Sequence, residues 1–439
     1  MSSTIQSAGV LTFEQAYRTV LDYCRQIPLP LTEEAPLPGA LGRVLADTVS
    51  ADRDFPAFHR ATRDGYAVRS ADLKEVPARL RVIGKIKAGA SFTARVNSGE
   101  AVEIMTGAAL PESTDAVVMV EYTSSLTSSD QVEIQRGIVS GENVVPAGAE
   151  ARKNQPLLVP GTRLGPAQIA LAAACGMSRF NVYLRPRVAI LATGDELVEV
   201  AETPGPQQIR NTNSYSLAAQ AEAAGGEAMR LPTAPDELKK LTTLIHAGLA
   251  ADMLLLSGGV SMGEFDLVEQ ALSSLDAEFF FTGALIQPGR PVVFGEVKFA
   301  GGSNGARKAG RARDPGHLGR PQLERKAIPF FGLPGNPVST MVTFDLFARP
   351  VLQVLSGATP TRLPSAKARL KKDWKTKTGL TRFLPAILEG ELEDPEVELV
   401  PWQGSGDLLA SAKANCYLVV PPDREAMAAG EIVSILLRS

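Results

Sequence analysis

The sequence predicts an α/β protein of several domains, organised around a parallel sheet that binds a ligand at the ends of its strands. At 439 residues the chain is too long for a single hydrophobic core. Between about residues 187 and 356, apolar runs of strand length alternate with helical patterns, which is typical of a doubly wound sheet. Short β-type runs before and after this region indicate smaller, β-rich domains.

The composition excludes several classes of protein. Hydrophobic residues make up 44% of the chain and charged residues 21%, as in ordinary soluble proteins. The 45 basic and 48 acidic residues nearly balance, so net charge does not favour nucleic acid as a partner. Three scattered cysteines suit a reducing compartment, and three scattered histidines show no metal spacing. Because we find no leader-like or membrane-length apolar segment, we expect a cytoplasmic protein that binds neither nucleic acid nor membrane.

The first part of the chain predicts a helical domain interrupted by a β-rich module. Thr12 begins a helix with Gln15 completing a capping box, and apolar residues recur at helical spacing through Cys24. A second helix is expected over residues 166–175. Between them lie β-type runs at residues 80–83, 102–105, 116–120 and 132–134. Because helical scaffolding resumes after these runs, we interpret the module as an insertion.

The central part predicts the parallel sheet. Continuous apolar runs occur at residues 188–192, 254–256, 278–281, 292–294 and 329–333. Ser214 is expected to cap a helix that stops at residues 225–226, and Asp236 to open another. After residue 356, strand patterns at 383–388, 397–400, 416–420 and 432–437 fit a small β-barrel or sandwich.

A basic, glycine-rich segment separates the last two strands of the sheet. Between residues 298 and 328 seven basic side chains stand against only Asp314 and Glu324. Such a segment can dock on nucleic acid or an anionic membrane. It lacks aromatic residues between Phe299 and Phe330 and has no helical period, so we favour a solvated, mobile connection between two strands.

One loop carries the strongest sign of ligand binding. The apolar run at residues 254–256 ends in SGGVSMGEFD (residues 257–266), and a helical pattern follows. Glycines can turn consecutive N–H groups around an anion, and serine hydroxyls add donors. Asp266 could hold a divalent cation against a phosphate. The alternative interpretation is a structural glycine turn in an α/β unit.

Two more strand ends carry unusual residues. TGDE (residues 193–196) follows one strand, and LPGNPVS (residues 333–339) ends another, where Asn336 should cap a helix and Pro337 take its first position. In open α/β sheets ligands bind beyond the carboxyl ends of the strands, so we expect one cleft. Carboxylates beside a phosphate site imply a neutralising cation, and Mg²⁺ favours oxygen ligands. Alternatively, Asp195 or Glu196 merely caps a helix.

These motifs, with QPGRP (residues 287–291), resemble those of the molybdopterin molybdenumtransferase (MoeA) family, whose eukaryotic relatives include the E domain of gephyrin. DGYA (residues 64–67) and MTGA (105–108) match motifs of that family's second domain. Arg382 and the pair Gly404-Ser405 match its C-terminal domain. The likeness runs in order from about residue 10 to the end.

The resemblance implies a four-domain homodimer. Helical domain I would comprise residues 1–52 and 146–184, and β-rich domain II residues 53–145. Residues 185–357 would form domain III, which binds molybdopterin, and residues 358–439 the β-barrel domain IV. Family members insert molybdate into adenylylated molybdopterin with release of AMP, yielding the molybdenum cofactor. A molybdopterin adenylyltransferase would be the upstream partner, and Mg²⁺ the cofactor.

The resemblance also assigns residues to a cleft between domain III of one subunit and domain II of its partner. Asp64, Thr106 and Glu150 would reach across the dimer. Arg382 and Ser405 would form a wall from domain IV and suit the oxygens of a dianion such as molybdate. Glu196 and Asp266 would be catalytic and hold Mg²⁺. The expected ligand-binding residues are Thr193, Gly194, Ser257, Gly258, Gly259, Ser261, Gly263, Pro334, Gly335, Asn336 and Pro337.

Some positions depart from the family pattern, and other functions remain open. Glu150 stands where Asp is usual, Thr233 where an acid is common, and Gly283 and Gln287 where some members carry lysines. Asp236 could replace the missing acid. The alternatives are a non-catalytic, cofactor-binding scaffold of the gephyrin E type, a molybdopterin adenylyltransferase, and a pyridine-nucleotide hydrolase on the same fold. Neither the choice of tungstate over molybdate nor transfer of substrate from a partner can be read from the residues.

Overall fold

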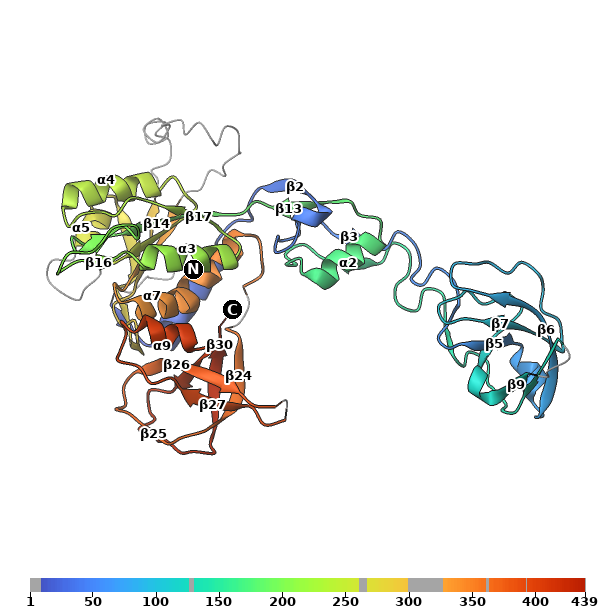
Figure 1. Ribbon diagram of the computed structural model, residues 1–439. Coiled ribbons are helices and arrows are strands. Elements are labelled where there is room, and N and C mark those ends of the chain that lie inside the picture. Colours follow the sequence, from blue (N-terminus) through green and yellow to red (C-terminus); the bar gives the residue numbers. More distant parts are fainter. Residues whose placement is uncertain are drawn as a thin grey trace, which may run out of the picture.

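The computed structural model describes residues 9–125, 130–259, 267–298, 327–360, 363–391 and 393–438. Ser261, Gly263 and Asp266 of the predicted site, and the basic segment 299–326, lie outside the described residues. Figure 1 shows an elongated chain, in which an α/β domain and a barrel pack together at one end. A small β-rich domain stands at the other end, and a narrow linker joins the two.

The linker contains two stretches of chain that run side by side. β2 (Thr32–Pro36) pairs antiparallel with β13 (Arg179–Tyr183), and β3 (Val49–Ser50) pairs with β12 (Pro156–Leu158). Because residues 53–145 leave and re-enter between these pairs, the β-rich domain is an insertion, as the sequence predicts. α2 (Pro166–Ala174) supplies apolar residues to the small core of the linker.

The first helix lies elsewhere than in the linker. α1 (Phe13–Cys24) has the predicted capping box between Thr12 and Gln15. Its apolar face, however, joins the main core of the α/β domain, and β1 (Val10–Leu11) pairs in parallel with β20 (Gly283–Ala284) of that domain. α1 therefore packs against the α/β domain, whereas α2 stays in the linker with short strands.

The inserted domain is built on one six-stranded sheet in the order β8-β5-β7-β6-β10-β9. Neighbouring residues of β5 enter different cores, Tyr66 and Val68 on one face and Ala67 on the other, so both faces are covered. The four predicted runs correspond to β6, β7, β8 and β10. The strands of this domain are β4 (Arg60–Ala61), β5 (Gly65–Val68), β6 (Ala78–Ile86), β7 (Glu100–Ile104), β8 (Ala116–Met119), β9 (Thr123–Ser125), β10 (Gln131–Ile134) and β11 (Val144–Val145).

The α/β domain contains a mixed sheet in the order β17-β14-β18-β23-β22-β19. The four strands from β17 to β23 are parallel, and three of them, β14, β18 and β23, match predicted runs, whereas β17 matches none. The last two, β22 and β19, run antiparallel to their neighbours. These strands are β14 (Arg187–Ala192), β17 (Glu227–Arg230), β18 (Met253–Ser257), β19 (Ala277–Phe281), β22 (Val293–Lys298) and β23 (Ala327–Leu333), with short pairs β15 (Leu197–Val198) and β16 (Ile209–Arg210) beside them.

Helices cover both faces of this sheet. Alternate residues of β18, such as Leu254 and Leu255, enter the two cores, one beneath α4 and α5 and the other beneath α1, α3, α7 and α8 (Figure 1). The helices are α3 (Asn213–Ala223), α4 (Leu238–Gly248), α5 (Leu267–Ser273), α7 (Pro337–Thr343) and α8 (Arg349–Leu355). A π-helical turn, Phe344–Ala348, makes α7 and α8 one continuous helix. That helix is long and apolar enough to span a membrane, but 83% of its apolar window is buried inside the protein, as expected of a core helix.

The C-terminal domain is a closed barrel. Its strands follow the order β26-β27-β24-β30-β28, and pairing of β28 with β26 closes the ring. β21 (Ile286–Gln287) leaves the α/β domain and adds in parallel to β26, so the two domains share a strand pairing. The elements of the barrel are β24 (Ser365–Leu370), β25 (Trp374–Lys375), β26 (Thr381–Glu389), β27 (Glu396–Leu399), α9 (Leu408–Lys413), β28 (Cys416–Val420), β29 (Ala426–Met427) and β30 (Ile432–Leu437).

Candidate active site

The three predicted strand ends meet at one edge of the sheet. The N–H of Thr193, which follows β14, donates to the carbonyl of Ser257 at the end of β18 over 3.0 Å. The N–H of Gly258 donates to the carbonyl of Leu333 at the end of β23 over 3.3 Å. Backbone groups therefore join the start of all three loops, and the loops face one region beyond the sheet.

Glycine is required where these loops touch. Gly258 has φ +87°, and a Cβ there would lie 2.4 Å from the carbonyl oxygen of Thr193. Gly259 has φ +65°, and its Cβ would lie 2.8 Å from the Thr193 side chain. Both positions combine a left-handed backbone with a neighbour at contact distance, so no other residue fits without moving the loop.

Asn213, which the sequence analysis did not select, ties two of the loops together. Its Nδ2 donates to the Ser257 hydroxyl over 2.9 Å and to the carbonyl of Gly335 over 2.6 Å. Its Oδ1 is buried and accepts no hydrogen bond from the described residues. A single amide thus bridges the loops that follow β18 and β23, and keeps an acceptor oxygen unused.

The start of α3 differs from the prediction. The helix begins at Asn213, and the Oδ1 of Asn211 accepts from the N–H of Ser214 over 3.1 Å. Ser214 is therefore not the cap, and its hydroxyl is buried without a partner among the described residues. Asn211 does the capping because its side chain lies three residues before that N–H, the usual reach of an N-cap.

Carboxylates lie beside the first strand end. The Thr193 hydroxyl donates to Asp236 over 3.1 Å, and the N–H of Asp236 donates to the carboxylate of Asp195 over 3.0 Å. Asp236 thus occupies the edge where a shifted acid was expected. Glu196 is exposed and its side chain folds over Gly194, and its carboxylate has no hydrogen bond or ion pair with a described residue.

The described carboxylates suit a metal shared with a ligand better than a metal held by protein alone. Among the described residues, no group of three His, Cys, Asp or Glu side chains is arranged to hold a metal ion. Mg²⁺ is commonly bound by one or two carboxylates together with substrate phosphates. The unpaired carboxylate of Glu196 fits that role.

The proline-rich loop after β23 is capped by the barrel. Asn336 holds the N-cap position and Pro337 the first helical position of α7, as predicted, but the Asn336 side chain makes no cap hydrogen bond. Instead the N–H of Val338 donates to the carbonyl of Ser405 over 3.0 Å. Thr340 donates to the carbonyls of Pro334 and Asn336 and fixes the turn. Ser405 of domain IV therefore sits against the loop of domain III.

Arg382 is a buried cation without a carboxylate partner. Only 5% of the residue is exposed. Its Nε donates to the Oε1 of Gln287 over 2.8 Å, and one Nη donates to the carbonyl of Leu380 over 3.1 Å. No acidic residue of the described chain forms an ion pair with it, and burial lowers the pKa of its guanidinium. A desolvated guanidinium with free N–H groups is suited to bind an anion.

Of the remaining predicted residues, Asp64 and Thr106 lie in the inserted domain and Glu150 lies just after it. The Asp64 carboxylate accepts from the N–H of Thr106 over 2.6 Å and from its hydroxyl over 2.8 Å. These bonds, the backbone one first, lower the pKa of Asp64. Glu150 pairs with Arg60 over 3.2 Å. Arg60 adjoins Ala61, whose carbonyl accepts from the residue after Thr106, so Glu150 lies near Asp64 and Thr106 at the linker end of the chain's inserted domain.

The sequence is similar to known proteins along nearly its whole length. Models of the MoeA N-terminal region (domain I and II), a probable molybdopterin binding domain and the MoeA C-terminal region (domain IV) match residues 11–176, 189–354 and 367–437. The chain belongs to the MoeA family. A molybdopterin molybdenumtransferase of Bacillus subtilis is 33% identical and that of Haemophilus influenzae 32%, each over 97% of this chain and over 93% and 98% of their own lengths.

Solved structures of MoeA proteins extend the likeness to the fold. The crystal structure of a molybdopterin biosynthesis MoeA protein from Pyrococcus horikoshii OT3 matches with a TM-score of 0.74 and 28% sequence identity. The match covers 98% of this chain and 100% of that one. The four-domain architecture is therefore that of the MoeA fold.

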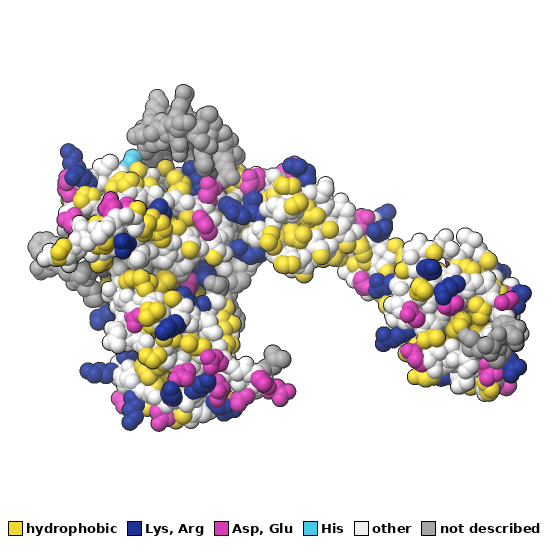
Figure 2. Space-filling view, in the orientation of Figure 1, with side chains coloured by type: hydrophobic (Ala, Val, Ile, Leu, Met, Phe, Trp, Pro, Cys, Tyr) yellow, Lys and Arg dark blue, Asp and Glu magenta, His cyan; other side chains and the backbone are white. Residues whose placement is uncertain are grey.

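The predicted residues do not all lie together within a single chain of this protein. The strand-end group comprises Thr193, Gly194, Glu196, Ser257, Gly258, Gly259, residues 334–337, Arg382 and Ser405. The inserted-domain group comprises Asp64, Thr106 and Glu150. Figure 1 places the domains that carry these groups at opposite ends, and Figure 2 shows open space between the inserted domain and the barrel.

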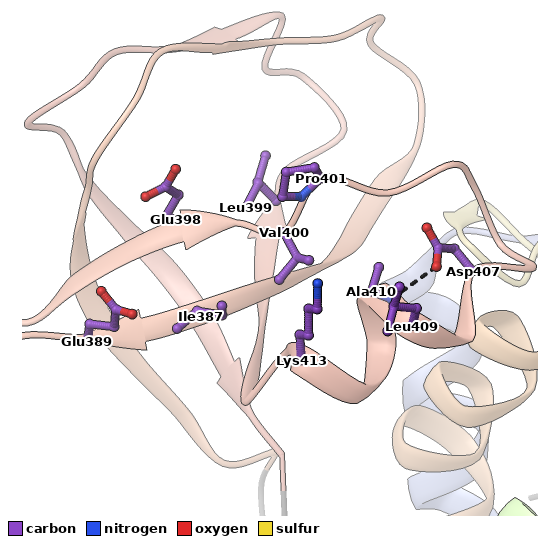
Figure 3. Close-up of a pocket in the computed structure, with 10 residues that line it drawn as sticks. All are labelled: Ile387, Glu389, Glu398, Leu399, Val400, Pro401, Asp407, Leu409, Ala410 and Lys413. Carbon is purple, nitrogen blue, oxygen red and sulfur yellow. Dashed lines mark hydrogen bonds between the residues drawn. The ribbon is translucent and has the colours of Figure 1, made fainter.

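A separate groove on the barrel holds none of the predicted residues. It has a volume of about 290 Å³ and lies between β26, β27 and α9 (Figure 3). Ile387, Leu399 and Val400 line it, and Lys413 reaches into it from α9. The two glutamates at its rim, Glu389 and Glu398, are paired with Lys371 and Lys372. Its third carboxylate, Asp407, accepts from the N–H groups of Gln403 and Ala410. Because its carboxylates all have partners and much of its wall is apolar, the groove is not suited to the chemistry of the strand-end group.

Replacing Thr106 by Val should raise the pKa of Asp64 toward its ordinary value, because the substitution removes the hydroxyl donor and keeps the backbone one. Thr106→Ser, which retains a hydroxyl, should leave that pKa low. The ionised carboxylate stabilises the folded chain above its unfolded-state pKa, and this contribution is lost as the pH falls through the lowered folded-state pKa. NMR titration of the Asp64 carboxyl measures the shift, and equal pKa values in both variants would contradict the assigned bond.

Proposed function

We propose that this MoeA-family chain is a molybdopterin molybdenumtransferase, which inserts molybdate into adenylylated molybdopterin and releases AMP during molybdenum cofactor biosynthesis. The observation that carries the proposal is that the glycine loops and a buried arginine without an ion pair both lie beside one helix, α7. The glycine loops of β14 and β18 adjoin Pro334, and Ser405 caps α7 from the barrel. Arg382, also of the barrel, stays unpaired beside Gln287 of the α/β domain.

Each group has a role that its chemistry supports. The N–H of Gly259 and the Ser257 hydroxyl would face the adenylyl phosphate, because the N–H groups of Gly194 and Gly258 already donate to the carbonyls of Ala234 and Leu333 and hold the loops together. Arg382 and the Ser405 hydroxyl would bind the oxygens of molybdate. Glu196, with Asp266, would hold Mg²⁺, which supplies charge neutralisation when bound. Bringing two anions together with their charge neutralised is most of the catalytic task, so no covalent intermediate on a side chain is needed.

We further propose that the working enzyme is a homodimer. The inserted domain of one chain stands far from its own strand-end group (Figure 1), so the partner subunit would supply the second wall of the cleft. Asp64, Thr106 and Glu150 would then face the substrate of the other subunit. We also propose that an adenylyltransferase supplies the adenylylated pterin and that the protein is located in the cytoplasm.

The deciding experiment is turnover of adenylylated molybdopterin with Mg²⁺, with and without molybdate. We expect AMP release that requires molybdate and stops when EDTA removes the metal, and Glu196→Gln should slow it about 10²-fold with the fold intact. AMP release independent of molybdate would refute the transferase. Consumption of ATP with unmodified molybdopterin would indicate an adenylyltransferase instead, and tight pterin binding without turnover a storage or scaffold protein.

A further inference from the structure

We propose that Gln287 is a positioning residue that holds the Arg382 guanidinium in place while leaving its charge unneutralised, so that one buried arginine binds a tetrahedral oxyanion. This inference deepens the proposed function and rests on it. Gln287 belongs to the α/β domain and Arg382 to the barrel, so the bond between them also sets the anion site across a domain boundary.

The backbone brings the two side chains together. β21 and β26 pair in parallel with Gln287 in register with Arg382. The Oε1 of Gln287 then accepts from Nε of Arg382 over 2.8 Å, and the carbonyl of Leu380 accepts from one Nη over 3.1 Å. A guanidinium has about five N–H donors, so roughly three are left for a ligand.

The α/β core fixes the position of Gln287. Two residues on, Gly289 has φ +102°, and a Cβ there would lie 2.4 Å from the side chain of Thr343 in α7. This close approach packs the turn after Gln287 against the same helix whose first turn is capped by Ser405. Contacts with α7 therefore set the positions of both barrel residues, directly for Ser405 and through Gln287 for Arg382.

The amide of Gln287 suits this role because it accepts a hydrogen bond without bringing a charge. A carboxylate in its place would make a similar bond but would cancel the positive charge of Arg382. Arg382 is 5% exposed whereas Gln287 is exposed, so water would screen such a pair only from the side of residue 287. No described acid pairs with Arg382, so the amide leaves the guanidinium the only charge of that contact.

The test compares Gln287→Glu with Gln287→Met in the full-length protein. Glu keeps the acceptor and adds a negative charge, whereas Met removes the acceptor and adds none. Gln131→Glu, at an exposed position in the inserted domain, has the same change in net charge and serves as the control. The measurements are KM for molybdate, KM for adenylylated molybdopterin, kcat, the melting temperature, and molybdate binding by equilibrium dialysis.

We expect the KM and the dialysis Kd for molybdate to rise at least about tenfold in Gln287→Glu and about threefold in Gln287→Met. The KM for the pterin, and kcat at saturating molybdate, should change less than about twofold in both. A merely structural role predicts the reverse order, because Glu would form an ion pair with Arg382 and stabilise the contact. Gln287→Glu should thus keep its melting temperature while losing molybdate.

Each outcome decides the inference. Wild-type molybdate affinity in Gln287→Glu, or a greater loss in Gln287→Met, would overturn the role of Gln287 while leaving the transferase intact. Molybdate that binds to the wild type and not to Gln287→Glu, in a protein that never releases AMP, would support the inference and refute the function. No molybdate binding to the wild type would overturn both.

Discussion

Two inactive variants, Asp64→Asn and Arg382→Gln, should restore activity when their subunits are exchanged. Each variant alone should lose about 10²-fold or more in turnover, because each removes a charge from the proposed cleft. After dissociation and random reassembly, half of the dimers are mixed. Each mixed dimer has one intact cleft of two, so activity should return to about a quarter of the wild-type value.

The reason lies in where one chain places its residues. Asp64 bonds with Thr106 in the inserted domain, and Arg382 bonds with Gln287 where the α/β domain meets the barrel. The linker holds these regions at opposite ends of the molecule (Figure 1). If the cleft combines both, the two residues come from different subunits, and a mixed dimer keeps one wild-type copy of each in the same cleft.

The control is a mixture of Glu196→Gln with Arg382→Gln. Both substitutions fall in the strand-end group, so every cleft of every dimer carries a defect and activity should stay low. Analytical ultracentrifugation confirms that each variant assembles. Assembled mixtures of Asp64→Asn and Arg382→Gln that remain inactive would place the whole site within one chain and contradict the proposed dimer.

The strand-end cleft is predictable from the sequence because parallel strands of one sheet finish at a common edge. Thr193, Ser257 and Leu333 each close an apolar run, and backbone bonds join those ends in the structure. Strand direction is not predictable in the same way. The run that forms β22 is as apolar as β14, yet β22 runs antiparallel to both of its neighbours, β23 and β19. Hydrophobic periodicity indicates burial and does not indicate direction.

Hydrophobic periodicity also does not predict which element a helix packs against or which group a polar side chain bonds to. The amphipathic pattern of α1 shows that one face is buried, but not that domain III buries it. Asn213 and Gln287 look like ordinary polar residues beside a helix start and a proline. Their contacts with Gly335 and Arg382 span 122 and 95 positions of sequence, which only the fold reveals. The grouping of Asp64 with the cleft came from the family resemblance alone.

Replacing Gly258 by Ala should nearly abolish turnover. The new Cβ would lie 2.4 Å from the carbonyl oxygen of Thr193, where ordinary contacts begin at 3.4 Å. The loops after β14 and β18 must then separate by about 1 Å, and a displacement of that size at a reacting centre costs about 10²-fold in rate. We expect a fall of that size in molybdate-dependent AMP release.

Gly430→Ala is the control that distinguishes the effect of this steric collision from the effect of backbone strain. Gly430 has φ +85°, close to the +87° of Gly258, but nothing lies within 4 Å of its added Cβ, and it belongs to a turn of the barrel. Both variants therefore carry the left-handed strain of about 1–2 kcal/mol. Only Gly258→Ala pushes two strand ends apart. If thermal unfolding shows both variants folded and Gly258→Ala retains full turnover, the adenylyl group does not bind against these loops, because a ligand held between them cannot tolerate their separation.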